Sequence, residues 1–197
     1  MAKAKKEQQY YNGIAVDSQE EIMTIMYIEE LIEAGYVKKL ERAESIRLSE
    51  RLENKYTQVV EMKTKTKEVE KNQVLLEEHI YTPEFKITWS QAGSELFVDS
   101  LVGSTGKLNK PFIKVYGYDT FIEVKPEFDQ NSMERLFKIN QKWVWDKHGV
   151  YINLVKPLKL FEKTFVPKKY LLTATGKPRV IHIPIRSLED YLKTLDK

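Results

Sequence analysis

The sequence predicts an α/β fold in which a helix, several strands, a second helix and a buried strand follow one another. Three observations predict it. A capped amphipathic stretch lies near the start, β-rich runs fill the middle, and a second helical pattern leads directly into the short apolar run Val150–Val155. With 197 residues the chain is long enough for one sizeable core and does not require two domains.

The first helix is predicted from Ser18 to Ala34. Asp17-Ser18 supplies a cap, acids occupy the first turn, and Gly35 follows the last one. Glu21 lies at the N-terminal end of a stripe that is otherwise apolar, so we expect its carboxylate at the rim of the core or directed at a ligand. Glu20, which faces another side of the helix, is the alternative helix carboxylate.

The middle of the chain reads as strands joined by turns. Residues 37–73 are charged and alternate in character, which predicts strands or a protruding hairpin. "VLLEEHIYTPEFKITW" has strand composition, and Pro83 predicts an edge or a bend within it. A second helix should begin at Asn131-Ser132 and stop at Gly149.

Composition limits the class of protein. Apolar residues make up 42% and charged residues 31%, and the absence of cysteine excludes disulfides and thiolate chemistry. There is no run of eighteen apolar residues, and Met1–Gln9 is basic without an apolar stretch behind it. We therefore expect a cytoplasmic protein with no membrane contact.

Basic residues are concentrated near the C-terminus. The net charge is only +3, but residues 156–186 contain eight lysines and arginines against the single acid Glu162. One interpretation is a surface that faces DNA phosphates, and the other is ordinary solvated strand and turn residues. A hairpin turning at 175–177 would place the expected DNA-binding residues on one ribbon: Lys168, Lys169, Lys177 and Arg179.

Two strand-like stretches carry acids among apolar neighbours, "YTPEF" around Glu84 and "FIEVKP" around Glu123. Alternation puts Glu123 and Lys125 on one side of their strand, about 7 Å apart. A neighbouring strand that brought Glu84 alongside would create a pair of carboxylates suited to Mg²⁺ or Mn²⁺, with the carbonyl of Val124 as a further ligand. Taken singly, such pieces are more often a surface ion pair and a turn.

These residues resemble the PD-(D/E)XK nuclease superfamily. Pro83-Glu84 is similar to its first motif, with glutamate where aspartate is commoner, and Glu123-Val124-Lys125 is similar to its second. "GIAVDSQEE" and "YTPEF" look like the opening helix and first motif of a phage and transposon branch. That branch includes phage Holliday-junction endonucleases and transposon end-cutting nucleases. The resemblance covers about residues 12–155.

The resemblance implies a restriction-endonuclease-like core at residues 12–155, with a central mixed sheet flanked by helices. The long separation of the two motifs implies an inserted hairpin near residues 96–118. Residues 1–11 would form a flexible basic N-terminus, and residues 156–197 a basic extension packed on the core.

The resemblance also implies a Mg²⁺- or Mn²⁺-dependent endonuclease that hydrolyses DNA at junctions, branches or ends, and that acts as a homodimer as many relatives do. Its catalytic residues would be Glu21, Glu84, Glu123 and Lys125, and its metal ligands Glu21, Glu84, Glu123 and Val124. The main alternative is a nucleic-acid-binding protein that keeps the fold without cleaving. A weaker alternative is a nuclease that acts on RNA.

Overall fold

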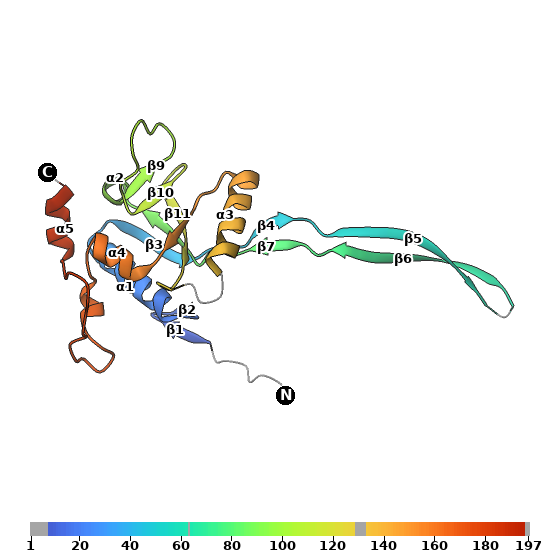
Figure 1. Ribbon diagram of the computed structural model, residues 1–197, viewed down its shortest axis with the longest axis horizontal. Helices are drawn as coiled ribbons and strands as arrows, with labels where there is room; N and C mark the ends of the chain where they lie inside the picture. The colour runs from blue at the N-terminus through green and yellow to red at the C-terminus, as the bar shows by residue number, and fades with distance from the viewer. Residues whose placement is uncertain (1–7, 63, 129–132, 196–197) are drawn as a thin grey trace. The chain divides into compact units, whose positions relative to one another are not determined.

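The computed structural model describes residues 8–62, 64–128 and 133–195. Within them the helices are α1 (Gln19–Glu33), α2 (Gln91–Phe97), α3 (Met133–His148), α4 (Pro157–Lys163), the 3-10 helix η1 (Lys168–Leu171) and α5 (Leu188–Leu195). The strands are β1 (Gln9–Tyr11), β2 (Ile14–Val16), β3 (Val37–Arg42), β4 (Ile46–Ser49), β5 (Leu52–Glu61), β6 (Thr66–Leu76), β7 (His79–Tyr81), β8 (Phe85–Trp89), β9 (Val98–Ser100), β10 (Phe112–Lys114), β11 (Asp119–Val124) and β12 (Ile152–Val155) (Figure 1).

The described chain forms two compact units. One consists of the residues up to Ala43 together with those from Pro83 onward, and the other of Glu44–Thr82. No helix in the described part of the chain has both the length and the apolar character needed to cross a membrane.

A mixed sheet in the order β12-β11-β8-β3 organises the first unit. β11 runs parallel to β12 and antiparallel to β8, and β8 is antiparallel to β3. Along β8 the alternation is clear, because Phe85, Ile87 and Trp89 are buried while Lys86 and Thr88 are half-buried on the opposite face. The predicted α/β class is confirmed, with a four-stranded mixed sheet at its centre.

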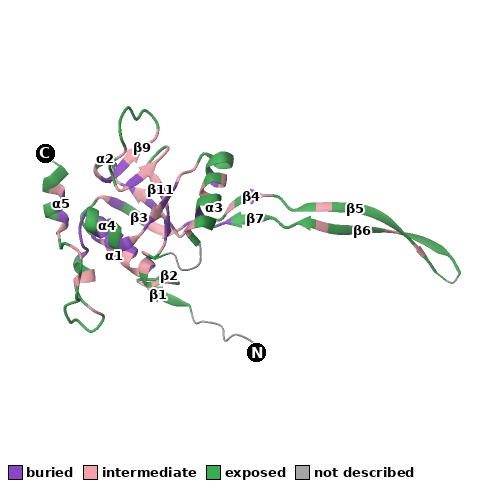
Figure 2. Ribbon diagram, in the orientation of Figure 1, coloured by how far each residue is buried: buried purple, intermediate pink, exposed green. Residues whose placement is uncertain are grey.

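Helix α1 begins and ends as its sequence predicts. The side chain of Ser18 caps the N-terminus, and Gly35 after the C-terminus has φ +79°, a conformation that only glycine adopts without strain. The apolar side of α1 packs into the core formed with the sheet through Ile25, Ile28 and Leu31, all without solvent exposure (Figure 2).

The second predicted helix corresponds to α3, which ends before Gly149. That glycine has φ +62°, as expected of a helix stop. The predicted start at Asn131-Ser132 lies outside the described residues. The buried strand predicted to follow α3 is β12, which completes the sheet beside β11.

Residues beyond Val155 belong to the same core as the sheet. Phe161 of α4, Phe165 and Tyr191 of α5 lie in the buried cluster that contains α1 and β8. Phe165 stacks on Tyr27 of α1 with ring centroids 4.3 Å apart. The C-terminal segment therefore covers part of the apolar face of α1 and completes the core there.

The hairpin predicted near residues 96–118 is wrong. β9 and β10 pair in parallel, with Phe112 opposite Val98, so the intervening loop returns the chain to its starting side instead of reversing it. Alternation in a sequence indicates that strands are present, but it does not indicate their relative direction.

The hairpin predicted at residues 175–177 is reduced to a turn. Gly176 has φ +76° and the amide of Thr173 donates to the carbonyl of Lys177 at 2.8 Å, but only the single bridge Leu172↔Pro178 follows. The amide of Arg179 also donates to the carbonyl of Leu171 at 2.8 Å, so the bridge is flanked by two hydrogen bonds and does not need an N–H at Pro178.

The second unit consists of two antiparallel pairs, β4 with β7 and β5 with β6. The β5–β6 pair runs from Leu52↔Leu76 to Glu61↔Thr66 and is almost entirely exposed (Figure 2). The expectation of strands or a hairpin between residues 37 and 73 is confirmed.

Candidate active site

Glu84 and Glu123 meet where β8 and β11 pair. The amide of Glu84 donates to the carbonyl of Ile122 at 3.0 Å, and the antiparallel register places Phe85 opposite Ile122. The register ends at this pair, and the hydrogen bond of Glu84 is one residue out of step with it, so the backbone is irregular at Glu84. The negative charge of Glu123 raises the pKa of Glu84, so the two carboxylates are neighbours.

Lys125 lies directly beyond β11 and forms an ion pair with Glu123. Its Nζ is 2.7 Å from Oε1 of Glu123, and the two side chains are only 13% and 8% exposed. The backbone N–H of Lys125 donates to the carbonyl of Val155 at 2.9 Å, which fixes the lysine at the junction of β11 and β12. The two side chains therefore share one side, as the alternation predicts.

Glu21 occupies the third helical position of α1, where it completes a capping box with Ser18. The amide of Glu21 donates to Ser18 Oγ at 3.2 Å, and that hydroxyl donates to Glu21 Oε1 at 3.1 Å. The carboxylate is 3% exposed. A purely structural role as a helix cap is therefore available to Glu21.

Arg42, at the end of β3, joins Glu21 to Glu84. Its guanidinium contacts Oε2 of Glu21 at 2.5 Å and Oε2 of Glu84 at 2.7 Å, and it also donates to the carbonyls of Ala15 and Glu84. The group lies over the ring of Phe85, 4.6 Å from its centroid. No pattern in the sequence indicates a role for Arg42, because its contacts depend on the pairing of β3 with β8.

The three carboxylates influence one another electrostatically. Burial raises the pKa of Glu84 above that of a free glutamate, the negative charges of Glu21 and Glu123 raise it further, and Arg42 opposes the shift. Glu21, and not Glu20, is the helix acid that takes part in this cluster. Val124, whose carbonyl was a predicted ligand, ends β11 with its side chain 6% exposed.

Three mutually repelling carboxylates form a donor set that suits Mg²⁺ or Mn²⁺, because hard cations prefer oxygen ligands. As the side chains stand, Arg42 and Lys125 neutralise these carboxylates, and the described residues contain no group of three acids or histidines positioned to hold a metal ion. A divalent cation at Glu84 would therefore take the place of the Arg42 guanidinium.

The four predicted DNA-binding residues lie in and after η1, and several are occupied by intramolecular contacts. Lys169 forms ion pairs with Glu29 and Glu33 of α1, at 3.0 and 3.4 Å. Arg179 stacks on the ring of Tyr170, 4.5 Å from its centroid, and donates to that residue's carbonyl. The remaining two are Lys168, whose amide donates to Glu30, and Lys177, which closes the turn at Gly176.

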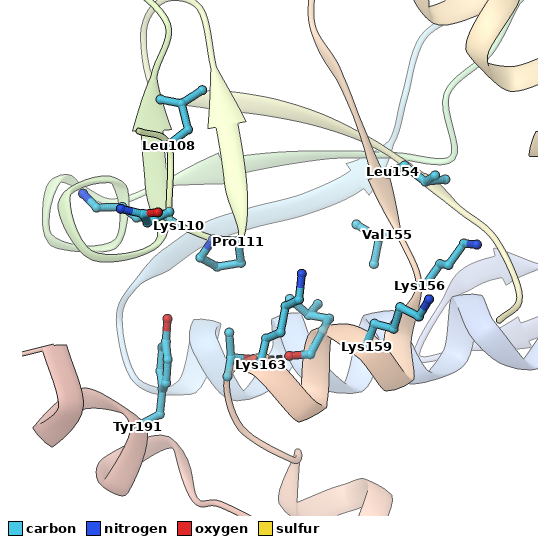
Figure 3. Close-up of a pocket in the computed structure, with 12 residues that line it drawn as sticks. Leu108, Lys110, Pro111, Leu154, Val155, Lys156, Lys159, Lys163 and Tyr191 are labelled. Atoms are coloured by element: carbon cyan, nitrogen blue, oxygen red, sulfur yellow. Dashed lines mark hydrogen bonds between the residues drawn. The ribbon is translucent and has the colours of Figure 1, made fainter. Parts of the chain in front are cut away.

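A basic cavity of about 350 Å³ opens at the end of β12, near the β12–α4 junction (Figure 3). Val155, whose carbonyl receives the amide of Lys125, is part of its wall, whereas the carboxylates of Glu21, Glu84 and Glu123 do not line it. Four lysines line it, namely Lys110, Lys156, Lys159 and Lys163, together with Tyr191. Lys156 and Lys159 are ion-paired with Glu134 and Glu127. Lys156, Lys159 and Lys163 belong to the basic segment 156–186 noted in the sequence, whereas Lys110 lies outside it.

Comparison with known proteins gave no match, whether to a protein-family model, to a curated protein or to a solved structure.

Proposed function

We propose that this chain is a metal-dependent endonuclease that hydrolyses DNA phosphodiester bonds, with a restriction-endonuclease-like core. The observation that carries the proposal is the convergence of three carboxylates from separate elements, Glu21, Glu84 and Glu123, beside Lys125. The resemblance of Pro83-Glu84 and Glu123-Val124-Lys125 to nuclease motifs supports it further. The phage and transposon branch that these motifs resemble suggests junctions, branches or ends as substrates, and a homodimer as the active form.

In this proposal Glu84, Glu123, Glu21 and the carbonyl of Val124 hold Mg²⁺ or Mn²⁺. The ion would lower the pKa of a bound water and offset negative charge on the scissile phosphate. Lys125 places a positive charge beside Glu123, where it can orient water or neutralise the phosphate. Arg42 keeps the carboxylates together in the absence of the ion.

A non-catalytic nucleic-acid-binding protein is the second candidate. It is favoured by the full pairing of the acids, since Arg42 contacts Glu21 and Glu84 while Lys125 contacts Glu123. The capping box at Ser18 gives Glu21 a structural role as well.

Cleavage assays distinguish the candidates. Supercoiled plasmid, a branched DNA junction and single-stranded RNA are incubated with wild type and with Glu123→Gln, each in Mg²⁺, Mn²⁺ or chelator. The proposal expects metal-dependent DNA cleavage that Glu123→Gln abolishes. Glu41→Gln is a matched control, because that carboxylate precedes Arg42 on β3 but is held by Lys39 and Lys86. Intact DNA in every metal would overturn the proposal, and cleavage of RNA alone would change the substrate.

A further inference from the structure

The β5–β6 ribbon has two faces of different chemistry. Its register places Tyr56 opposite Lys71 and Thr57 opposite Glu70. Opposed residues share a face and neighbours along a strand alternate, so the face of every ribbon residue follows from this register.

One side, the basic face, has no acidic residue between Asn54 and Gln73. Lys65 immediately precedes β6 and continues the alternation, because the amide of Met62 donates to its carbonyl at 2.9 Å. The members of the basic face are Asn54, Tyr56, Gln58, Val60, Met62, Lys65, Lys67, Val69, Lys71 and Gln73. It therefore combines three lysines, three side-chain amides and one exposed tyrosine.

The opposite side, the acidic face, carries most of the ribbon's negative charge. Its members are Glu53, Lys55, Thr57, Val59, Glu61, Thr66, Glu68, Glu70, Asn72 and Val74. Asn72 donates to Oε2 of Glu53 at 2.6 Å, a contact that requires both residues to lie on this face. Four glutamates oppose one lysine here, so the ribbon's charges are segregated between its faces.

The lysines of the basic face differ from several lysines of the first unit. Lys125, Lys156 and Lys169 each form an ion pair within the protein. In the described part of the chain no acidic side chain forms an ion pair with Lys65, Lys67 or Lys71, and all three lysines are exposed. Their charges remain available to an external anion.

The ribbon also lacks a covering layer. Tyr56 is 43% exposed and Met62 53% exposed, and nearly every other residue of both strands faces solvent. A two-stranded hairpin is only marginally stable by itself, and it leaves both outer edges unpaired. The length and exposure of this hairpin are therefore better explained by a binding role than by a contribution to a core.

We propose that the basic face of the β5–β6 ribbon binds duplex DNA in its major groove. A two-stranded ribbon fits that groove, which is about 12 Å wide, and ten paired residues extend over about 34 Å, close to one turn of B-DNA. Lys65, Lys67 and Lys71 reach phosphates, while the amides of Asn54, Gln58 and Gln73 face base edges. The acidic face is turned away from the DNA.

The choice of DNA among polyanions rests on the proposed nuclease function, whereas the choice of face rests on the register alone. The deep and narrow major groove of A-form RNA does not admit side chains, so the basic face should prefer DNA duplex over RNA duplex.

The test is equilibrium binding of full-length protein to a labelled duplex of about 30 base pairs (about three turns), followed by anisotropy across a salt series in chelator. The slope of log affinity against log salt concentration is negative, and losing one phosphate contact reduces its magnitude by about 0.9. Lys67→Gln should show this loss, and the triple Lys65→Gln, Lys67→Gln, Lys71→Gln variant should lose about 2 to 3. Lys55→Gln is the matched control, because it removes an equally exposed lysine from the acidic face of the same ribbon.

An unchanged slope in the triple variant, or an equal change in Lys55→Gln, would overturn the proposal. The proposal would also be overturned if the triple variant lost as much affinity for RNA duplex as for DNA duplex. A concentration-dependent self-association of wild type that the triple variant abolishes would overturn it as well, because the basic face would then pair with another copy of the chain. Chelator separates this test from catalysis. If DNA binding depends on the basic face but no DNA is cleaved in the presence of metal, only the proposed nuclease function is refuted. If DNA is cleaved but the triple variant keeps the salt slope of wild type, only the proposed role of the ribbon is refuted.

Discussion

Lys125 is the residue at which the enzymatic and structural explanations of the site diverge. Its ion pair with Glu123 is nearly buried. If the pair is only structural, loss of the lysine leaves a buried carboxylate without its partner and should cost roughly 3–5 kcal/mol of stability. If Lys125 acts on the phosphate, its charge matters most where negative charge develops during the reaction.

We predict that Lys125→Met lowers the cleavage rate on the order of a hundredfold or more, while the protein keeps its fold and its DNA affinity. Plasmid cleavage measured beside the urea unfolding midpoint checks this. Lys86→Met is the control, because Lys86 projects from the same sheet and is ion-paired with Asp119 at 3.2 Å. If Lys125→Met is strongly destabilised and wild type itself shows no nuclease activity, the structural role of Lys125 is favoured instead.

Some residues of the site can be predicted from the sequence and others cannot. Glu123 and Lys125 are two positions apart on one strand, so alternation alone places them together. The capped helix similarly identifies Glu21. Arg42 is not predictable in this way, because its contacts with Glu84 and Glu21 depend on which strand pairs with β8 and on how α1 packs.

At the scale of single elements, Glu134 ties the first turn of α3 to the end of β12. Its carboxylate lies 3.0 Å from Lys138 on the same helix and 2.8 Å from Lys156, which follows β12. Hydrogen bonds from Lys156 and Lys138 lower the pKa of Glu134 to about 2, from the ordinary 4.5. The folded state therefore binds this proton less readily than the unfolded state does.

We predict that this carboxylate stabilises the fold above pH 4.5 and that its contribution is lost as the pH falls from 4.5 toward 2. Glu134→Gln should lower stability at neutral pH and give a flatter loss of stability on acidification. Thermal unfolding measured from about pH 6 down to about pH 2, a range that covers the window set by the two pKa values, checks this. Glu189→Gln, which changes a first-turn glutamate of α5, should leave the slope of wild type. An identical acid slope in wild type and Glu134→Gln would refute the linkage.

The short helix α2 packs directly on the chain that leaves α1. A β-carbon added at Gly93 would lie 1.9 Å from the carbonyl oxygen of Tyr36, which neither backbone could accommodate without moving. We predict that Gly93→Ala destabilises the protein by about 1–3 kcal/mol. Gly106→Ala is the matched control, because nothing lies within 4 Å of its added carbon. Equal unfolding midpoints for the two variants would contradict the packing of α2.

Elements with local signals could be predicted, and those fixed by distant partners could not. Caps and stop glycines give α1 and the end of α3, and alternating charged residues give the β5–β6 ribbon. The parallel pairing of β9 with β10 was missed because the direction of a strand is set by its partner and by the route of the loop. The turn at Gly176 was predicted, but the pairing beyond it is a single bridge between Leu172 and Pro178.

Over the whole molecule, a net charge of +3 conceals a strongly uneven distribution. Four lysines surround a cavity at the end of β12, and the basic face of the ribbon carries three more. Long-range attraction of a polyanion depends on such local clusters more than on the net charge. The two clusters belong to different compact units, so their contributions to binding can be separated experimentally.

The division into two units predicts that the ribbon can be removed without unfolding the rest. Replacing residues 51–77 by an Asn-Gly turn keeps β4 and β7 and removes only the exposed β5–β6 pair. Because that pair buries few apolar side chains, the free energy of unfolding should stay within about 1 kcal/mol of the intact chain, and unfolding should remain a single transition. Duplex binding in chelator should weaken and become less salt-dependent, whereas the carboxylate cluster should respond to Mn²⁺ as it does in the intact chain. A shortened chain that unfolds, or that binds duplex with the original salt slope, would show that the ribbon supports the fold or that the DNA lies elsewhere.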